Sequence, residues 1–574
     1  MIERIKDLYK GIKDSLNRFP MTIIASSILV IMLIVLYEGD AQFSSNTKTV
    51  LQRISMITAL GIPLSLCIKL IYEKRDGFNR VQRYLGWALG IAFLILYYFL
   101  LLKSFTTVSV GRYIGLSISL YLAFSYIPWI GRKKDFEPYI IRVLSSLFLT
   151  IIYSAVLYMG ISAILFAIDQ LLDIDVPRKF YYYSFLMVAG IFAPSSFLAR
   201  IPKVDHDFEG YDYPRALKLL LVYIVIPLIS IYSVILYMYF AKIIMTRNWP
   251  KGLVSHLVLW YSFISVAVIF FITPIIEDSI WARRFRIWFP RLNIPILIMM
   301  FMSIGIRIRA YGVTENRYFV SILGLWIFCI MLYFIMRKDL KNILIPLTLS
   351  IVSLNTVFGP LSSFAISNRS QNGRLEAILD RNNMLGDDGI IRSEGDISKD
   401  DRMEVSMILK YFDMHHSLED VRYLEDSFTI GDMESVFGFS YVEKNIFDSD
   451  DFYIFNENRE KALEIGGYDY LSRGYDMEDG MKLEDDITIS YDIESNVFTI
   501  RDEKPIYTVD LQDLVSDIIA EYGHNNFDME GEHLPTMDDL IFTDENDRVR
   551  VKFIINSISG GRSDQSGRYT FYDM

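Results

Sequence analysis

Residues 21–37 read MTIIASSILVIMLIVLY, a run of 17 residues without a charged side chain. A helix needs about 20 mostly apolar residues to cross a bilayer, whose hydrocarbon core is about 30 Å thick. Glu38 and Asp40 follow without a small-residue cleavage site, so we expect a membrane helix here and not a removable signal peptide. Ten further runs of this kind begin near Ile54, Tyr84, Tyr113, Val143, Phe180, Leu217, Leu253, Leu292, Tyr318 and Asn342. The sequence therefore predicts a polytopic α-helical membrane bundle of about 11 transmembrane helices, followed by a soluble α+β domain.

Charge divides the 574-residue chain near residue 370. Residues 371–574 contain 19 Lys and Arg against 48 Asp and Glu, whereas residues 1–370 contain 38 against 20. The net charge of −11 is therefore the remainder of a basic, apolar part and an acidic, polar part. This division excludes a purely soluble enzyme and a disordered chain. The negative charge of the second part also argues against nucleic acid as a partner.

Basic residues of the first part recur in every second loop. The six basic segments contain Arg4, Lys6, Lys10, Lys13 and Arg18; Lys74, Arg75, Arg80 and Arg83; Arg132, Lys133, Lys134 and Arg142; Arg200, Lys203 and Arg215; Arg283, Arg284, Arg286 and Arg291; and Arg337, Lys338 and Lys341. Because Lys and Arg are retained on the cytoplasmic side, we expect a multi-pass protein of the cell membrane with a cytoplasmic N-terminus. An odd number of spans then places the C-terminal domain outside the cell, and one missed or false helix would reverse that side.

The expected domain organisation follows from these patterns. It comprises a cytoplasmic segment over 1–19, a transmembrane helical domain over 20–366, a linker over 367–400 and an acidic, extracytoplasmic α+β domain over 401–574. In the last part, helical spacing is found at Met403, Ile408, Leu409 and Phe412, and in the segment 510–522. Alternation of apolar and polar residues predicts strands over 487–491, 496–500, 506–509, 549–553 and 569–572.

The densest polar group of the first part lies between the ninth and tenth runs. It consists of Arg307, Arg309, Tyr311, Glu315 and Arg317. Three guanidinium groups and a carboxylate this close together cannot all face lipid. Arginine binds carboxylate and phosphate groups in bidentate geometry, so one hypothesis is a site for a lipid headgroup or an anionic substrate. The other is a structural Arg–Glu network that joins two helices.

The search for catalytic and metal-binding motifs is negative. The sequence contains no phosphate-binding loop of the GxxxxGK type, no GxSxG, no HExxH and no CxxC. We therefore expect no cofactor and no metal site, and a non-enzymatic role is favoured. The adjacent His415 and His416 are expected in a solvated loop or helix end. Asp448, Asp450 and Asp451 resemble part of a calcium loop but lack its glycine and its terminal glutamate.

The stretch 306–318, IRIRAYGVTENRY, and the following Gly324, Leu325 and Trp326 resemble a bacterial membrane-protein family named "domain of unknown function 4153". Further similar stretches are FAPSSFLARIP at 192–202, WPKG at 249–252, Gly359 with Pro360, and Ser370 and Gln371 with Arg374 and Leu375. The resemblance covers most of residues 15–385. It implies an integral membrane protein but no activity. It also implies a role in the common fold or function for Arg309, Tyr311, Gly312, Thr314, Arg317 and Tyr318.

Three functional hypotheses follow. The leading one is a non-enzymatic protein of the cell envelope, whose membrane bundle anchors an external acidic domain that binds a cell-surface component or a partner protein. The alternative is a transporter or lipid-handling membrane protein with a site near Arg307–Arg317. A membrane-embedded transferase is the third, although no residue within the spans specifically supports it.

Overall fold

The computed structural model divides the chain into two compact units, Met1–Tyr441 and Val442–Met574. It describes residues 13, 15–40, 42–75, 77–132, 135–172, 174–206, 208, 210–246, 253–386, 391, 397–425, 427–442, 451–455, 465–472, 481–483, 487–492, 497–502, 504–511, 515–516, 518, 537–555, 557–562 and 569–573. The WPKG stretch, Asp448, Asp450 and most of the expected helix over 510–522 lie outside these residues.

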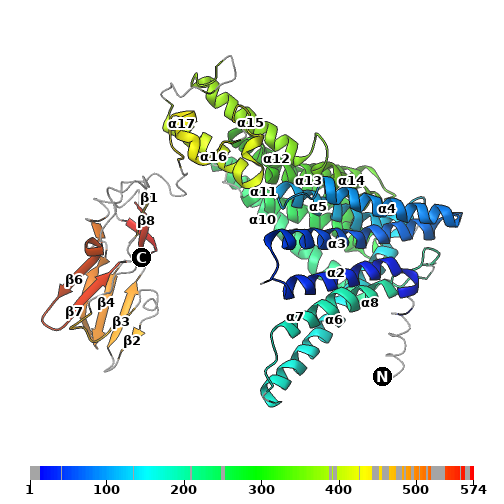
Figure 1. Ribbon diagram of the computed structural model, residues 1–574, viewed down its shortest axis with the longest axis horizontal. Coiled ribbons are helices and arrows are strands. Elements are labelled where there is room, and N and C mark those ends of the chain that lie inside the picture. Colours follow the sequence, from blue (N-terminus) through cyan, green and yellow to red (C-terminus); the bar gives the residue numbers. More distant parts are fainter. Residues whose placement is uncertain are drawn as a thin grey trace. The chain divides into compact units, whose positions relative to one another are not determined.

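Among the described residues of the first unit, ten helical segments are long and apolar enough to cross a bilayer. They are Pro20–Glu38 (α2), Ser45–Lys74 (α3), Arg80–Leu100 (α4), Thr107–Tyr126 with Ile127–Trp129 (α5, η1), Phe136–Leu172 (α6), Lys179–Met187 with Val188–Phe192 and Ala193–Ala199 (α7, η2, α8), Arg215–Leu219 with Leu220–Val225 and Ile226–Thr246 (α9, η3, α10), Leu253–Ile272 with Thr273–Ile275 (α11, η4), Ile280–Tyr311 (α12) and Glu315–Met336 (α13). A shorter apolar helix, Leu344–Val357 (α14), follows. The prediction of a polytopic helical membrane bundle is confirmed (Figure 1).

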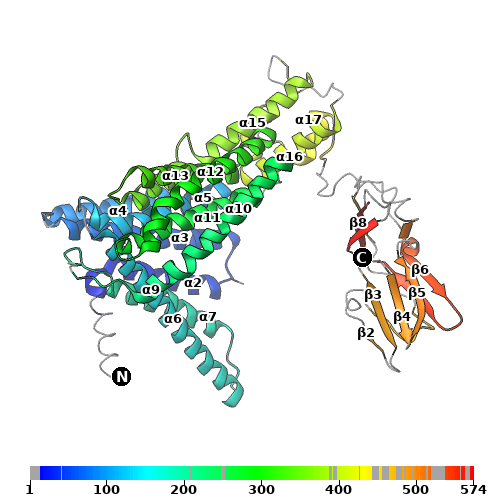
Figure 2. The ribbon, with the colours of Figure 1, turned by 180° about the vertical axis from the view of Figure 1, so that it is seen from behind.

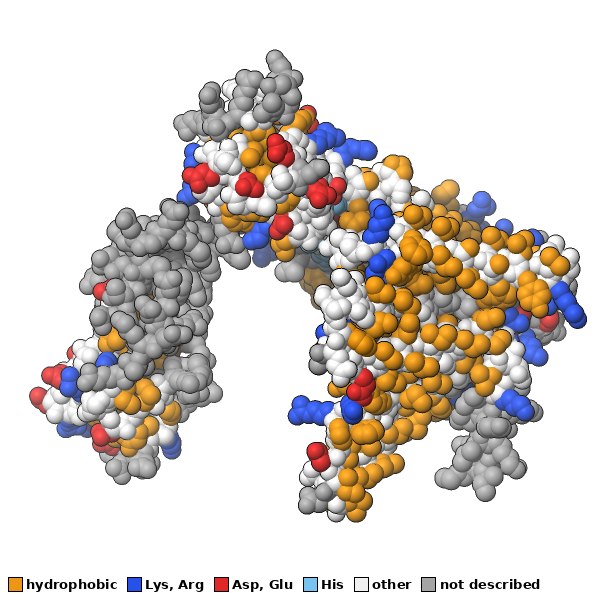
Figure 3. All heavy atoms as spheres, in the orientation of Figure 1, with side chains coloured by type: hydrophobic (Ala, Val, Ile, Leu, Met, Phe, Trp, Pro, Cys, Tyr) orange, Lys and Arg blue, Asp and Glu red, His pale blue; other side chains and the backbone are white. Residues whose placement is uncertain are grey.

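The membrane helices turn apolar side chains outward. In α4, Leu85 and Leu89 are 58% and 62% exposed, and in α6 Phe148 is 65% exposed. Figure 3 shows apolar side chains covering the visible face of these helices. Exposing so much apolar surface to water would be costly, whereas a lipid environment removes that cost. The outward surface therefore supports the membrane assignment independently of helix length.

Side-chain caps mark the starts of several membrane helices. Ser44 accepts a hydrogen bond from the backbone N–H of Thr47 at the start of α3. Asn79 and Gln82 form a reciprocal capping box at the start of α4. Such caps satisfy N–H groups that have no partner within the helix, so they favour a helix start at these positions.

Polar contacts join four of the six basic segments at one end of the bundle. Arg18 donates to both carboxylate oxygens of Glu73, at 3.0 and 2.8 Å, and to the carbonyl oxygen of Ile201 at 2.6 Å. Arg132 donates to the carbonyl oxygen of Val204 at 2.5 Å. Four of the basic segments that alternate along the sequence are thus grouped in space.

Helix α14 carries the chain from one end of α13 back to the other. Before α14, Asn342 donates a 2.6 Å hydrogen bond to Glu137 in the first turn of α6. After α14, the carbonyl oxygen of Leu361 accepts a hydrogen bond from Tyr318, in the first turn of α13. These two contacts show that the chain between Asn342 and Leu361 runs the length of α13. The 14 residues of α14 alone rise only about 21 Å, so the residues on either side of the helix cover the rest.

Three helices after the bundle belong to the same compact unit, and we call them the helical cap. They are Ser363–Arg381 (α15), Lys399–His415 (α16) and Met433–Phe437 (α17). Leu375 of α15 and Phe412 of α16 are buried in one apolar core. The segment 367–400, which was expected to be a linker, contains most of α15. Because the apolar faces of α15 and α16 pack together, the chain divides after Tyr441 and not at residue 400.

The described part of the second unit contains three antiparallel β-sheets and a short 3-10 helix, Met537–Leu540. One pairs β1 (Asp451–Phe455), β8 (Ser557–Arg562) and β9 (Tyr569–Asp573); another pairs β2 (Met481–Lys482), β3 (Thr488–Asp492), β4 (Val497–Asp502) and β5 (Lys504–Asp510); a third pairs β6 (Ile541–Glu545) and β7 (Arg550–Ile554). Phe498 of β4 packs edge-on against Phe553 of β7 at 5.1 Å between ring centroids. The strands predicted from alternation coincide with β3, β4, β5, β7 and β9.

Candidate functional site

Helices α12 and α13 are joined by a tight turn at Gly312, whose φ and ψ are 69° and −179°. Glycine alone adopts this conformation without appreciable strain. The backbone N–H of Gly312 donates to the carbonyl oxygen of Ile308 at 2.8 Å, which closes α12. Helix α13 begins at Glu315, and Thr314 before it makes no side-chain cap. The turn therefore leaves backbone polar groups that another part of the chain must satisfy.

Helix α15 supplies those partners. Ser370 Oγ accepts a 2.9 Å hydrogen bond from the N–H of Val313. Gln371 Nε2 donates to the carbonyl oxygens of Tyr311 and Val313, at 3.2 and 3.0 Å. Arg374 Nη1 donates to the carbonyl oxygen of Tyr311 at 3.0 Å. One face of α15 thus satisfies the turn and holds it against the helical cap.

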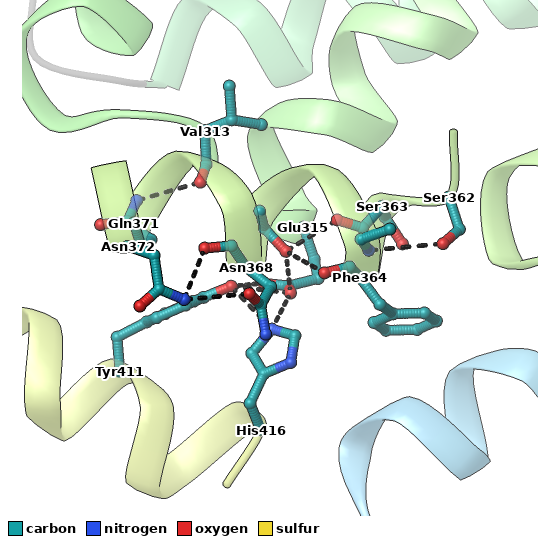
Figure 4. A network of polar contacts seen from close by, with 12 residues as sticks. Val313, Glu315, Ser362, Ser363, Phe364, Asn368, Gln371, Asn372, Tyr411 and His416 are labelled. Atoms are coloured by element: carbon teal, nitrogen blue, oxygen red, sulfur yellow. Dashed lines mark hydrogen bonds and ion pairs between the residues drawn. The ribbon is translucent and has the colours of Figure 1, made fainter. Parts of the chain in front are cut away.

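The carboxylate of Glu315 lies at the centre of a buried network (Figure 4). Its Oε1 accepts from Ser367 Oγ of α15 at 2.5 Å, from the Tyr411 hydroxyl of α16 at 2.7 Å and from Nε2 of His416 at 2.7 Å. The Tyr411 hydroxyl also lies 3.0 Å from His416 Nε2. The side chains of Glu315 and His416 are only 15% and 3% exposed. One carboxylate at the end of a membrane helix therefore fastens two helices of the cap.

The contacts of this network join α13 to α15 and to the end of α16. Burial, with a further contribution from the charge of Glu315, raises the pKa of Tyr411 far above its ordinary value, so the phenol remains a hydrogen-bond donor at neutral pH. Ser367 Oγ bonds to Glu315 and to the carbonyl oxygen of Ser363 at 2.7 Å. The hydroxyl is therefore not directed at an imidazole, as an activated serine nucleophile would be. No three His, Cys, Asp or Glu side chains converge on a metal position within the described part of the chain.

The structure joins only some of the five residues predicted as one polar site. Arg317 Nη1 donates to the carbonyl oxygens of Tyr311 and Gly312, at 3.0 and 2.8 Å, and its guanidinium lies 5.5 Å from the centroid of the Tyr311 ring. Arg307 is half-buried and Arg309 is exposed. The expected Arg–Glu pairing is replaced by Glu315 bonded to His416, Tyr411 and Ser367. Residues two apart on a helix point to different faces, so Arg317 cannot turn toward Glu315.

Sequence reasoning missed the cap side of this site. His416 was expected in a solvated position with His415, but its imidazole is buried against Glu315. Tyr411 and Ser367 carried no functional expectation. Ser370, Gln371 and Arg374 were noted only for their resemblance to a family. The local signal in that stretch is the spacing of polar residues on one helical face, which favours a helix bearing a polar contact surface over a linker.

Comparisons with known proteins identify a family. A family model described as "Domain of unknown function (DUF4153)" matches residues 23–382, a range that includes Glu315 and Ser367 and ends before Tyr411 and His416. An uncharacterized protein of Pasteurella multocida is 24% identical over 334 residues, or 58% of this chain. The chain spans about half the length, 55%, of that curated relative. No solved structure matches the chain. Because the family model covers more than half of the sequence, the chain belongs to the DUF4153 family of unknown function.

Proposed function

We propose that the membrane bundle anchors residues 442–574 as an acidic binding domain of the cell envelope. The observation that carries this proposal is the fastening of the helical cap to α13 through Glu315. The cap gives the chain a firm attachment to the membrane unit before it leaves that unit at Tyr441. A domain that binds a partner beside a membrane gains from such an anchor, because the anchor already restricts the translational and rotational freedom that binding would otherwise remove.

Charge indicates the class of partner. Residues 442–574 contain 12 Lys and Arg against 32 Asp and Glu. An excess of this size attracts a cationic surface and repels anionic polymers and headgroups. The partner is therefore a cell-surface component or protein with a positive face. An open apolar groove between α12 and α13 favours the alternative, lipid handling near Arg307–Arg317.

A chain ending at Tyr441 tests the anchoring role. We expect it to remain in the membrane and to purify as a folded bundle, because the first unit has its own cores. It should lose chemical crosslinking to the envelope partner. Crosslinking by the full chain should weaken as salt rises from about 0.05 to 0.5 M, because salt screens exposed charges. A full chain with Asp502→Asn and Asp547→Asn, both exposed acidic residues, should crosslink less. Undiminished crosslinking by the shortened chain contradicts the proposal.

We further propose that the N-terminus is cytoplasmic and that residues 442–574 lie outside the cell. The grouping of basic segments at one end of the bundle supports the first part. The return of the chain along α13 through α14 supports an odd number of crossings. An alkaline phosphatase fused after Tyr441 should be active, because that enzyme folds only after export. A fusion after Lys74, in a basic loop, is the matched control and should be inactive. The reverse pattern contradicts this topology.

A further inference from the structure

An open apolar groove runs between the outward faces of α12 and α13. Ile298, Phe301 and Met302 of α12 line it together with Leu325 and Phe328 of α13, around a volume of about 480 Å³. The two helices pack side by side, as Figure 2 shows. Ile298, Met302 and Leu325 are each about half exposed. The groove therefore opens onto the surface that faces lipid.

Beyond the groove, the same face of α12 continues to Arg309. Ile298, Met302, Gly305 and Arg309 follow the spacing i, i+4, i+7 and i+11, so they share one face of the helix. A Cβ atom built on Gly305 would meet no atom within 4 Å, so the face between the groove and Arg309 is unobstructed. Eleven residues of helix rise about 16 Å, close to half of the roughly 30 Å hydrocarbon core. The face thus matches the acyl region of a single leaflet.

Among the residues that the structure describes, no carboxylate pairs with the positive charge at the end of this face. Arg309 is exposed, and within the described residues no hydrogen bond or ion pair joins it to another side chain. Arg307 lies near enough to Arg317 for their charges to repel. Glu315, the acidic residue of the turn, is occupied by Ser367, Tyr411 and His416. A guanidinium at the headgroup level of an apolar groove is complementary to a phosphate.

We propose that this groove binds an anionic phospholipid, with an acyl chain along Ile298, Met302 and Gly305 and the headgroup phosphate at Arg309. The site goes beyond the anchoring function and gives the lipid-handling alternative a defined ligand class. A zwitterionic phospholipid offers the same acyl chains without the net negative charge. Preference between these two lipids therefore separates a binding site from ordinary solvation by the bilayer.

The test is native mass spectrometry of the purified full chain after exchange into equal amounts of phosphatidylglycerol and phosphatidylcholine. We expect phosphatidylglycerol to be retained preferentially. Arg309→Gln should lower its retention about fivefold, the effect of one cation near a headgroup. Arg309→Lys should keep most of it. Arg337→Gln, at the other end of α13, is the matched control and should retain the lipid normally.

A second pair of variants tests the contact with the acyl chain and leaves the charge of the protein unchanged. Gly305→Leu should obstruct the face between the groove and Arg309 and abolish the preference, whereas the protein should stay folded because the position borders open space. Gly160→Leu on α6, where a Cβ also meets nothing within 4 Å, is the matched control and should leave retention unchanged. Equal retention of the two lipids overturns the proposal. So does an Arg309→Gln chain that behaves like Arg337→Gln, or a Gly305→Leu chain that behaves like Gly160→Leu.

Discussion

Replacing Glu315 by alanine is expected to release the helical cap from the membrane helices. The change removes the acceptor that Ser367, Tyr411 and His416 share. Ser367 can still bond to the carbonyl oxygen of Ser363, and Tyr411 can still bond to His416. The remaining buried donor loses its partner, so the cap should lose about 1–3 kcal/mol of attachment. Limited proteolysis of the purified protein should cut between α15 and α17 about tenfold faster than in the unmodified chain, while the membrane helices remain protected.

Two variants serve as controls for this result. Glu315→Gln keeps one acceptor oxygen but loses the charge, so its cap should be cut at an intermediate rate. Glu376→Ala removes another carboxylate of the cap, one that is 36% exposed and bonds to Tyr423 at 3.0 Å. Because water can replace an exposed partner, this variant should behave nearly as the unmodified protein. A cap that stays equally protected in Glu315→Ala would show that the network does not fasten it.

Gly312→Ala is expected to have the second large effect, at the turn itself. A Cβ at this position would lie 2.6 Å from Arg374 Cδ, 2.9 Å from Gln371 Nε2 and 3.1 Å from Ser370 Oγ. The positive φ adds backbone strain of about 1–3 kcal/mol. The three side chains that satisfy the turn must then move away from it. We expect a loss of about 3 kcal/mol or more, measured as a lower thermal midpoint in detergent and faster proteolysis of the cap.

Two other glycines separate the causes of this effect. Gly359 also has a positive φ, of 85°, but no atom lies within 4 Å of its Cβ position. Gly359→Ala should therefore show the strain without the collision, and a smaller loss. Gly373 lies within α15 with open space around it, so Gly373→Ala should be neutral or stabilising by up to about 1 kcal/mol. If Gly312→Ala costs no more than Gly359→Ala, close packing of α15 on the turn is excluded as the cause.

Much of the architecture could be predicted because its causes are local. Lipid requires each crossing segment to be apolar whatever its neighbours are, so residues 21–37 and the later runs can be recognised as membrane helices from their composition alone. The strand at Arg550–Ile554 could be predicted because alternation records one buried face. The domain boundary near residue 400 could not be predicted correctly. Leu375 and Phe412 belong to helices whose apolar residues have ordinary amphipathic spacing, and this spacing does not show which surface the helix packs on.

The candidate site could be located but not assembled from the sequence. The density of charge around Arg309 and Glu315 draws attention to the turn, because polar groups beside a membrane need partners. The partners of Glu315 carry no local signal, since Tyr411 and His416 lie 96 and 101 residues further along the chain. Tertiary packing brings these residues to Glu315. The same packing buries His416, although the residues next to it in the sequence favoured a solvated position.

This separation along the chain has a consequence for biogenesis. Glu315 enters the membrane with α13, before the ribosome has made Tyr411 and His416. At a synthesis rate of about 5–20 residues per second, roughly 5–20 s pass before its partners 96 and 101 residues later emerge. During that interval the carboxylate must remain hydrated or protonated at the edge of the bilayer. Docking of α16 is therefore a late assembly step that follows insertion of the helices.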